Sequence, residues 1–289
     1  MSHVAICITT AARPEMLSRC LNSVISAVRS IESRVTLIVV DNDSTGAARP
    51  VVQSCDGVIP LIYEMEPRRG IPFGRNRCLS VALSIGADYL VFVDDDMTVA
   101  PDWLGQLLLA AQRLGADVVT GEVINVFSNG SEAPKYLVRT GLRLTAETDN
   151  VVFKRWIAER LRFDERLAVS GGSDTLFFRQ AHGLGAKIHH AMSAVAYEHL
   201  HGDRGTRSWF LRRNYRYGLV GVDIERLLRR KSVTMRFLAR AGVSVALGVF
   251  EAVFFLWRAD PTRSFGIYRV ARGGGMLMGA LGNRAKAYF

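Results

Sequence analysis

One short stretch, residues 89–96, restricts the fold of this chain more than any other. Five apolar or aromatic residues run without interruption from Tyr89 to Val93, and three aspartates follow directly. A β-branched and aromatic run of this length predicts a strand buried on both faces. Carboxylates at the carboxyl end of such a strand face the crevice in which open α/β sheets bind ligands. The stretch therefore predicts an α/β sheet with an acidic ligand site at its edge.

The three aspartates are not equivalent. Alternation along an extended chain places Asp94 and Asp96 on one side and Asp95 on the other. Adjacent carboxylates repel each other unless positive charge neutralises them, and a hard divalent cation with oxygen ligands does this. Asp94 and Asp96 are therefore candidate cation ligands. The alternative is a solvated acidic turn that caps the next helix.

Strand-like and helix-like segments alternate through residue 126. The strand-like runs lie at 3–9, 35–40, 61–63, 89–93 and 118–126, and the helical patterns lie at 14–30, 73–85 and from 101 onwards. This alternation predicts a mostly parallel, Rossmann-like α/β sheet with helices on both faces. The first strand is not followed by GxGxxG, and there is no Walker lysine, so the common dinucleotide and P-loop patterns are missing.

The middle of the chain is less regular. Residues 127–150 are polar and rich in turn formers, which predicts a surface loop. A helix is expected over 175–182 and a strand over 194–198. Asp174 comes directly before that helix, so it is either an N-cap or a functional carboxylate, and the two roles are compatible.

The last third of the chain differs from the rest in net charge and in its pattern of apolar residues. Residues 1–200 hold 20 Lys and Arg against 22 Asp and Glu, whereas residues 201–289 hold 17 against 5, a net charge of +12. Two apolar runs lie there, at 241–257 and 267–281. The first is shorter than the roughly 20 residues of a bilayer span and contains Glu251. We therefore expect a basic, apolar helical extension lying on an anionic membrane surface, with an ordinary helical subdomain as the alternative.

Six short motifs stand in an order that resembles the family 2 glycosyltransferases of the GT-A fold. They are Ile8-Thr9-Thr10, VVDNDS at 39–44, GIPFGRN at 70–76, Asp94-Asp95-Asp96, Gly172-Ser173-Asp174 and Tyr197-Glu198-His199. The resemblance covers residues 3 to about 220. It implies a GT-A glycosyltransferase domain at 1–220, followed by a membrane-associating helical segment at 221–289.

The resemblance also implies roles for single residues. Nucleotide contacts are expected from Thr9, Asp41, Arg75 and Asp94, and Asp174 is similar to the catalytic base of the family. A Mn²⁺ or Mg²⁺ ion on the donor diphosphate is expected at Asp94 and Asp96. From the residues alone, Arg69 in a glycine- and proline-fixed loop is a candidate phosphate contact, and His199 is a candidate further metal ligand. The alternatives are a solvated arginine and a structural histidine.

The chain departs from the family pattern in three places. Ser173 stands where the family often has glutamate before the aspartate. Thr10-Ala11-Ala12-Arg13 replaces the usual Thr-Tyr-Asn-Arg after the first strand. The Gln-x-x-Arg-Trp motif of processive polysaccharide synthases is absent, because residues 204–209 are RGTRSW. The resemblance therefore implies an enzyme that adds one sugar per encounter.

The expected function is inverting transfer of one sugar from a nucleotide-diphosphate sugar, with a UDP bias from the family, to a hydroxyl acceptor. The acceptor is expected to be lipid-linked or a saccharide, in polysaccharide or glycolipid assembly at the cytoplasmic face of the inner membrane. Four cysteines without a C-x-x-C pair and the lack of a signal-peptide pattern agree with a reducing compartment.

Two other functions are compatible with parts of the sequence. A sugar nucleotidyltransferase also uses metal-binding acids on an α/β sheet. It would need a glycine-rich, lysine-bearing loop after the first strand, which residues 9–14 lack. A non-catalytic protein that binds membranes or nucleic acid would explain the basic last third but not the aspartates. Since no RNA or DNA motif is present, a nucleic-acid partner is not expected.

Overall fold

The computed structural model describes residues 1–29, 31–55, 57–127, 130, 141–200, 206–228, 233–254 and 263–284. Contacts divide the chain into two compact units. The sheet unit comprises residues 1–168 and 173–200, and the helical unit comprises residues 169–172 and 201–289. The expected boundary at residue 220 falls inside a helix of the helical unit, α7 (Arg207–Leu227), so that unit starts earlier than expected.

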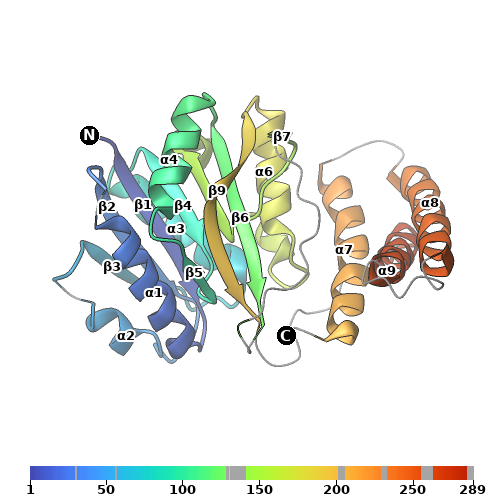
Figure 1. Ribbon diagram of the computed structural model, residues 1–289, viewed down its shortest axis with the longest axis horizontal. Helices are drawn as coiled ribbons and strands as arrows, with labels where there is room; N and C mark the ends of the chain where they lie inside the picture. Colours follow the sequence, from blue (N-terminus) through green and yellow to red (C-terminus); the bar gives the residue numbers. More distant parts are fainter. Residues whose placement is uncertain are drawn as a thin grey trace. The chain divides into compact units, whose positions relative to one another are not determined.

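The sheet unit contains nine strands and six α-helices among the described residues (Figure 1). The strands are β1 (His3–Thr10), β2 (Arg34–Asp41), β3 (Leu61–Met65), β4 (Tyr89–Val93), β5 (Met97–Val99), β6 (Val118–Val126), β7 (Gly141–Arg143), β8 (Asn150–Lys154) and β9 (Ile188–His199). The helices are α1 (Pro14–Val28), α2 (Arg49–Gln53), α3 (Ile71–Ser84), α4 (Trp103–Arg113), α5 (Arg155–Arg160) and α6 (Ser173–Gly183), with a 3-10 turn at Glu165–Leu167.

The strands form one sheet in the order β3-β2-β1-β4-β8-β6-β9-β5, and β7 pairs with β9. The first four strands in this order are parallel, as expected. β8 then lies between β4 and β6 and is antiparallel to both, which makes the sheet mixed. The expected surface loop over 127–150 is wrong at Gly141–Arg143, which form β7. Residues 128–129 and 131–140 of that loop lie outside the described part of the chain.

Helices cover both faces of the sheet, which is why its central strands are apolar on both sides. Helices α1 and α4 share one apolar core with alternate strand residues, and Leu21, Trp103 and Ile6 lie in it. Helices α3, α5 and α6 share the other core, with Phe92 and Phe177 in it. Helix α1 forms because Pro14 suits a first helical turn and the buried residues recur every three or four positions.

The helical unit consists of α7, α8 (Val233–Phe254) and α9 (Arg263–Ala280). The first expected apolar run, 241–257, lies in α8 as far as Phe254, and its residues 255–257 lie outside the described ranges. The second, 267–281, lies in α9 except for residue 281, which follows the helix. Helices α7 and α9 approach backbone to backbone, because a Cβ added at Gly275 would lie 1.8 Å from the Tyr215 carbonyl oxygen. In the other direction, a Cβ added at Gly218 of α7 would lie 2.2 Å from the Arg272 carbonyl oxygen of α9.

Residues 169–172 belong to the helical unit although they precede α6 in the chain. Arg216 of α7 donates from Nε and Nη2 to the Ser170 carbonyl oxygen, at 3.1 and 2.8 Å. Gly171 and Gly172 both have positive φ, at 78° and 83°, a conformation that favours glycine. A Cβ at Gly172 would also lie 2.4 Å from Val220 Cγ1. This tetrapeptide is therefore packed tightly on α7.

Helix α8 has the length and composition to cross a bilayer, although one such helix is weak evidence for a span. Its most apolar window has a mean hydropathy of 1.7 and is only 17% buried. Glu251, the acid within this helix, is turned inward, and its Oε1 lies 3.2 Å from Arg269 Nη2 of α9. The outward side of α8 between residues 243 and 254 therefore carries apolar side chains, including Val243, Leu247 and Phe250.

Candidate active site

Asp94, directly after β4, lies at the carboxyl end of the parallel strands. Its side chain is 37% exposed, and its Oδ1 lies 3.7 Å from Arg75 Nη2 of α3. Burial raises the pKa of Asp94 to about 6; Arg75 opposes this rise, and the charges of Asp96, Asp174 and Glu198 add to it. Because these negative charges are close enough to influence Asp94, the carboxylates gather at one edge of the sheet.

Asp95 faces the β1–α1 loop instead. Thr10 Oγ1 donates to Asp95 Oδ2 at 2.7 Å, and Arg13 Nη1 lies 3.2 Å from Asp95 Oδ1 and 3.5 Å from Asp96 Oδ2. Burial raises the pKa of Asp95 to about 6, although Arg13 and Thr10 act in the opposite direction. Ala12 in the same loop has φ = 53°, a conformation uncommon for a non-glycine residue. The β1–α1 loop, which departs from the family pattern, thus binds Asp95 and Asp96 through Thr10 and Arg13.

Arg75 connects the end of β4 with the start of α6. It is 7% exposed, its Nη1 donates to Ser173 Oγ at 3.4 Å, and its guanidinium carbon lies 5.7 Å from the centre of the Phe163 ring. Its Nε has no hydrogen-bond partner within the part of the chain that the structure describes. A buried guanidinium with a free donor suits an anionic ligand, because it forms charge-assisted hydrogen bonds.

Asp174 occupies the first turn of α6, directly after Ser173, so the structure brings it to the same edge as Asp94. Its Oδ1 accepts a hydrogen bond from the Thr175 backbone N–H at 2.7 Å. Asp174 thus lies inside the helix, which begins at Ser173, and not directly before it as the sequence suggested. The bond to the Thr175 N–H restrains the carboxylate, while Oδ2 remains available to accept a proton.

Asp41, the expected nucleobase contact, is fully buried. Its Oδ2 accepts from the Ala48 N–H and the Tyr63 hydroxyl, each at 3.0 Å, and its Oδ1 accepts from the Asp43 N–H at 3.1 Å. These bonds stabilise the loop after β2. Only Oδ1 retains an unused acceptor site for a ligand. The structure therefore gives Asp41 a structural role, and the nucleobase contact stays a prediction.

Asn42 shapes the neighbouring loop that carries Arg69. It accepts from the Gly70 N–H at 3.0 Å and donates to the carbonyl oxygens of Glu66 and Arg68, at 2.8 and 2.7 Å. Arg69 is exposed on this loop. Thr9 lies under the start of α3, where a Cβ added at Gly74 would be 3.3 Å from Thr9 Cγ2. The predicted nucleotide contacts thus surround one end of β1 and β2.

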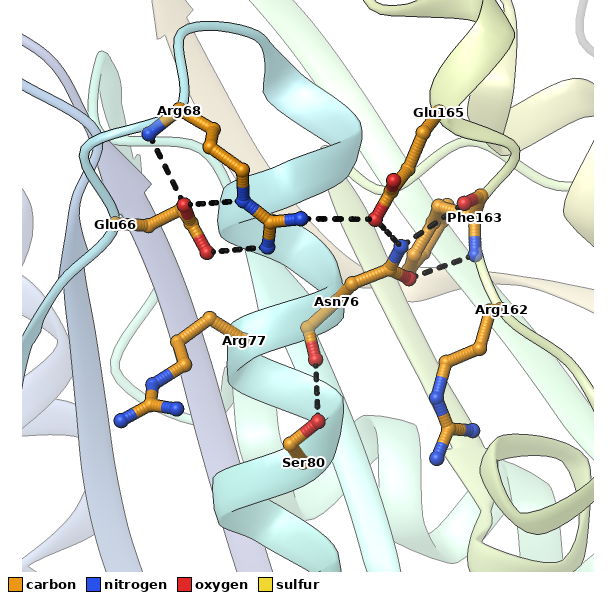
Figure 2. Close-up of a pocket in the computed structure, with 8 residues that line it drawn as sticks. All are labelled: Glu66, Arg68, Asn76, Arg77, Ser80, Arg162, Phe163 and Glu165. Carbon is orange, nitrogen blue, oxygen red and sulfur yellow. Dashed lines mark hydrogen bonds and ion pairs between the residues drawn. The ribbon is translucent and has the colours of Figure 1, made fainter.

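A surface pocket of about 350 Å³ lies beside this loop (Figure 2). It is lined by Glu66, Arg68, Asn76, Arg77, Ser80, Arg162, Phe163 and Glu165. Arg68 forms two bonds with the Glu66 carboxylate, at 2.9 and 2.8 Å, and Arg77 pairs with Glu64 at 2.8 Å. Asp94 and Asp174 do not line it. Since neither of these aspartates lines it, this pocket is not the predicted donor site.

His199 does not lie in a preformed metal cage. Its Nε2 is 2.9 Å from Thr98 Oγ1, in a hydrogen bond between β9 and β5. Within the described residues, no three His, Cys, Asp or Glu side chains are grouped so that they could hold a metal ion. The oxygen donors of Asp94 and Asp96 still suit Mg²⁺ or Mn²⁺, because such ions are commonly held by one or two carboxylates together with substrate phosphates.

Several residues at this edge were not assigned a role from the sequence. Thr10 and Arg13 hold Asp95, and Glu198 and Asp149 add negative charge close to Asp94. Burial, followed by the charge of Glu147 and then those of Asp94, Glu198 and Asp174, raises the pKa of Asp149 well above its usual value. A signal for Asp149 was the run NVVFK at 150–154, a short strand-like pattern with an acid directly before it.

The fold and this acidic edge together define a GT-A glycosyltransferase. The sequence model of Glycosyl transferase family 2 matches residues 5–183, so the chain belongs to glycosyltransferase family 2 and is an enzyme of that kind. The Succinoglycan biosynthesis protein ExoM of Rhizobium meliloti (strain 1021) is 31% identical to it, over 97% of this chain and 93% of its own length.

Solved structures support the fold. S. aureus TarS 1-349 in complex with UDP superposes with a TM-score of 0.59 at 16% identity, covering 96% of this chain and 90% of its own. The mannosyltransferase PcManGT from Pyrobaculum calidifontis, in complex with GDP-Man and Mn2+, gives a TM-score of 0.63 at 17% identity, covering 95% of this chain and 86% of its own. At such identities the likeness concerns the fold alone.

Proposed function

We propose that this enzyme transfers one sugar from a nucleotide-diphosphate sugar to an acceptor hydroxyl, with inversion at the anomeric carbon. The observation that carries the proposal is the position of Arg75, which contacts both Asp94 at the end of β4 and Ser173 beside Asp174. Donor-binding and proton-accepting groups thus lie on either side of one buried cation. Complexes of related folds with UDP, UDP-GlcNAc and GDP-Man agree with a nucleotide-sugar donor.

Each residue has a specific task in this proposal. Thr9 and Arg69 hold the nucleotide, Asp41 supports the nucleobase end through the loop after β2, and Arg75 attracts the diphosphate through its positive charge. Asp174 accepts the proton of the acceptor hydroxyl as that oxygen attacks the anomeric carbon from the face opposite the leaving group. One in-line displacement inverts the configuration. Asp95, held by Thr10 and Arg13, keeps the strand end rigid.

Asp94 and Asp96 are the residues that would hold a Mn²⁺ or Mg²⁺ ion. Asp94 is reachable from solvent, whereas Asp96 is 8% exposed and shares Arg13 with Asp95. Such an ion supplies charge neutralisation for the departing diphosphate. His199 stays a candidate further ligand; its Nε2 is bonded to Thr98, which leaves Nδ1 as the nitrogen that would face an ion.

A donor screen tests the proposal. Full-length protein is incubated with UDP-glucose, UDP-galactose, UDP-N-acetylglucosamine or GDP-mannose, with Mn²⁺ or with EDTA, and nucleotide release is measured. We expect turnover of one donor above the others, dependent on the metal. Formation of a sugar-nucleotide bond from a sugar phosphate and UTP would instead indicate the nucleotidyltransferase. The β1–α1 loop disfavours that alternative, because Thr10 and Arg13 bind Asp95 and the loop has no lysine.

For the acceptor we infer only a chemical class. A relative named for succinoglycan biosynthesis, together with the absence of the processive motif, favours addition of single sugars to a saccharide or lipid-linked acceptor in polysaccharide or glycolipid assembly. Extracted lipid-linked saccharides and free oligosaccharides, offered in parallel with the donor identified above, distinguish the two acceptor classes.

The membrane partner is inferred from the helical unit. The outward side of α8 is apolar from Val243 to Phe254, and Arg236 and Arg240 are exposed near the other end of the helix. Because Glu251 is paired with Arg269, no unpaired acid of α8 opposes burial in lipid. We infer that α8 lies in an anionic surface at the cytoplasmic face of the inner membrane.

Vesicle flotation tests this inference. The protein should float with vesicles that contain phosphatidylglycerol and should float less at high salt or with neutral vesicles. Replacing both Val243 and Phe250 with Asp should abolish flotation. Equal flotation of wild type with neutral and anionic vesicles would contradict the anionic surface. Flotation without turnover of any donor would favour the non-catalytic membrane-binding alternative.

A further inference from the structure

Asp149 stands directly opposite Asp94 at the edge of the sheet. β4 and β8 are antiparallel, with Val93 paired to Asn150, so the next residues on the two chains are Asp94 and Asp149. Facing residues of an antiparallel pair project to the same side of the sheet. That side carries α3 and α6, from which Arg75 and Asp174 come. Asp149 therefore lies within the proposed donor site.

The residues on either side hold Asp149 firmly. Asn150 is 1% exposed; its Oδ1 accepts from Trp103 Nε1 at 2.8 Å, and its Nδ2 donates to the carbonyl oxygens of Glu122 and Ala194, each at 2.9 Å. Thr148 is also 1% exposed. A half-buried carboxylate between two buried neighbours has little freedom to move away from the site.

Asp149 forms neither a hydrogen bond nor an ion pair with the described residues. The described charges that act on it most strongly are those of four acids: Glu147, Asp94, Glu198 and Asp174. A half-buried carboxylate surrounded by like charge destabilises the free protein. Such an arrangement is typical of functional sites, where a ligand supplies the missing interactions.

The chemistry of the site indicates which ligand this is. A carboxylate only accepts hydrogen bonds, and each oxygen can take two. Vicinal hydroxyl groups of a pyranose donate hydrogen bonds at suitable spacing, whereas a sugar carboxylate would be repelled by Asp149 and its acidic neighbours.

We propose that Asp149 accepts hydrogen bonds from hydroxyl groups of the donor sugar and makes the enzyme select neutral sugars over uronates. The inference rests on the proposed function, because it assigns a partner within the same site. Loss of one charged hydrogen bond should weaken sugar binding about tenfold. Loss of the negative charge should reduce discrimination against a uronate by at least about tenfold.

The test uses Asp149→Asn and the matched control Glu159→Gln, an exposed acid of α5. Calorimetry with Mn²⁺ should give the same Kd for UDP, within about twofold, in wild type and both variants. KM for the best neutral donor should rise about tenfold in Asp149→Asn only. The ratio of kcat/KM for UDP-glucose to that for UDP-glucuronate should fall at least about tenfold in the same variant.

The possible failures are distinguishable. If wild type turns over none of the donors, the proposed function is wrong and this inference falls with it. If wild type is active and Asp149→Asn keeps both KM and the glucose-to-glucuronate ratio, only the inference is overturned. Loss of UDP affinity together with a lower melting temperature would indicate a structural role and would also overturn it. Asp149→Ser, which removes the charge with a smaller side chain, repeats the measurement if Asp149→Asn folds poorly.

Discussion

The sheet unit gathers its acids at one solvent-accessible edge, whereas the helical unit turns the acid of α8 inward. At the sheet edge, Asp94 and Asp149 are close to further carboxylates, and their pKa values are raised by burial and by like charge. In the helical unit, Glu251 is paired with Arg269 at 3.2 Å, and its Oε2 has no partner among the described residues. Carboxylates are thus crowded together in the sheet unit, whereas the one carboxylate of α8 is paired with an arginine.

The difference shows what each unit requires. Crowded carboxylates cost stability, so they persist where a cation or a sugar can relieve the repulsion. An unpaired acid on α8 would oppose burial of its apolar side, so the helix pairs it internally. Four changes, taken from the largest expected effect to the smallest, test this contrast.

Asp174→Asn should have the largest effect. The amide cannot accept the proton of the acceptor hydroxyl, so kcat should fall by about 10²–10⁴-fold. Donor affinity should be unchanged, because the amide oxygen can still accept the Thr175 N–H bond. Steady-state kinetics and UDP calorimetry measure the two quantities, with Glu159→Gln as control. Transfer at the wild-type rate would remove Asp174 from the mechanism.

Gly275→Ala should destabilise the helical unit by about 1–3 kcal/mol through overpacking. The added methyl group would lie 1.8 Å from the Tyr215 carbonyl oxygen, which is backbone and must shift. Gly242→Ala is the matched control, because nothing lies within 4 Å of its added Cβ. It should stabilise α8 by about 0.5–1 kcal/mol. Urea unfolding of both variants measures the difference, and equal midpoints would contradict the close packing of α7 and α9.

Mn²⁺ should stabilise the protein more at pH 7.5 than at pH 5. The pKa values of Asp94 and Asp95 are raised to about 6, so without metal the native state binds extra protons between about pH 4 and 6, and its stability falls as the pH rises through that window. Above pH 6 the carboxylates are ionised and the cation relieves their repulsion. Melting temperatures with Mn²⁺ or EDTA at both pH values measure this. If Mn²⁺ raised the melting temperature more at pH 5 than at pH 7.5, the assignment of Asp94 as a metal ligand would be contradicted.

The Glu251 pair should give the smallest effect. Glu251→Gln keeps a hydrogen-bond acceptor, and Arg269 is 45% exposed, so we expect a change in unfolding free energy below about 1 kcal/mol. Arg269→Ala should lower the unfolding free energy more than Glu251→Gln does, because it leaves the Glu251 carboxylate without its cation. It should also weaken binding to anionic vesicles more than Glu251→Gln does. Equal effects on flotation would indicate that the pair has no role in lipid binding.

The sequence predicted the parallel half of the sheet better than the mixed half. The strands at 89–93 and 118–126 match β4 and β6 in both bounds, because β4 is a continuous apolar run and β6 is rich in β-branched residues. β8 was missed because its apolar core of three residues follows a polar stretch, and its place between β4 and β6 depends on long-range pairing. The role of Asp149 was missed for the same reason, since its position follows from that pairing.

The candidate site was predicted in part. The sequence placed Asp94, Arg75 and Asp174 in one site, and the structure brings Arg75 into contact with Asp94 and with the start of α6. The sequence could not indicate that both oxygens of Asp41 are used by the protein, because their partners include Tyr63, 22 residues further along the chain. Nor could it indicate the Thr98 bond of His199, which spans 101 residues.

The tetrapeptide before α6 sets a lower limit on how far the enzyme can be truncated. The family match ends at residue 183, and a fragment ending at residue 200 would retain every strand of the sheet. Such a fragment would lose Arg216 and with it the two hydrogen bonds to Ser170, which lies four residues before Asp174. We therefore expect that a folded catalytic fragment has to extend through α7 to keep full activity.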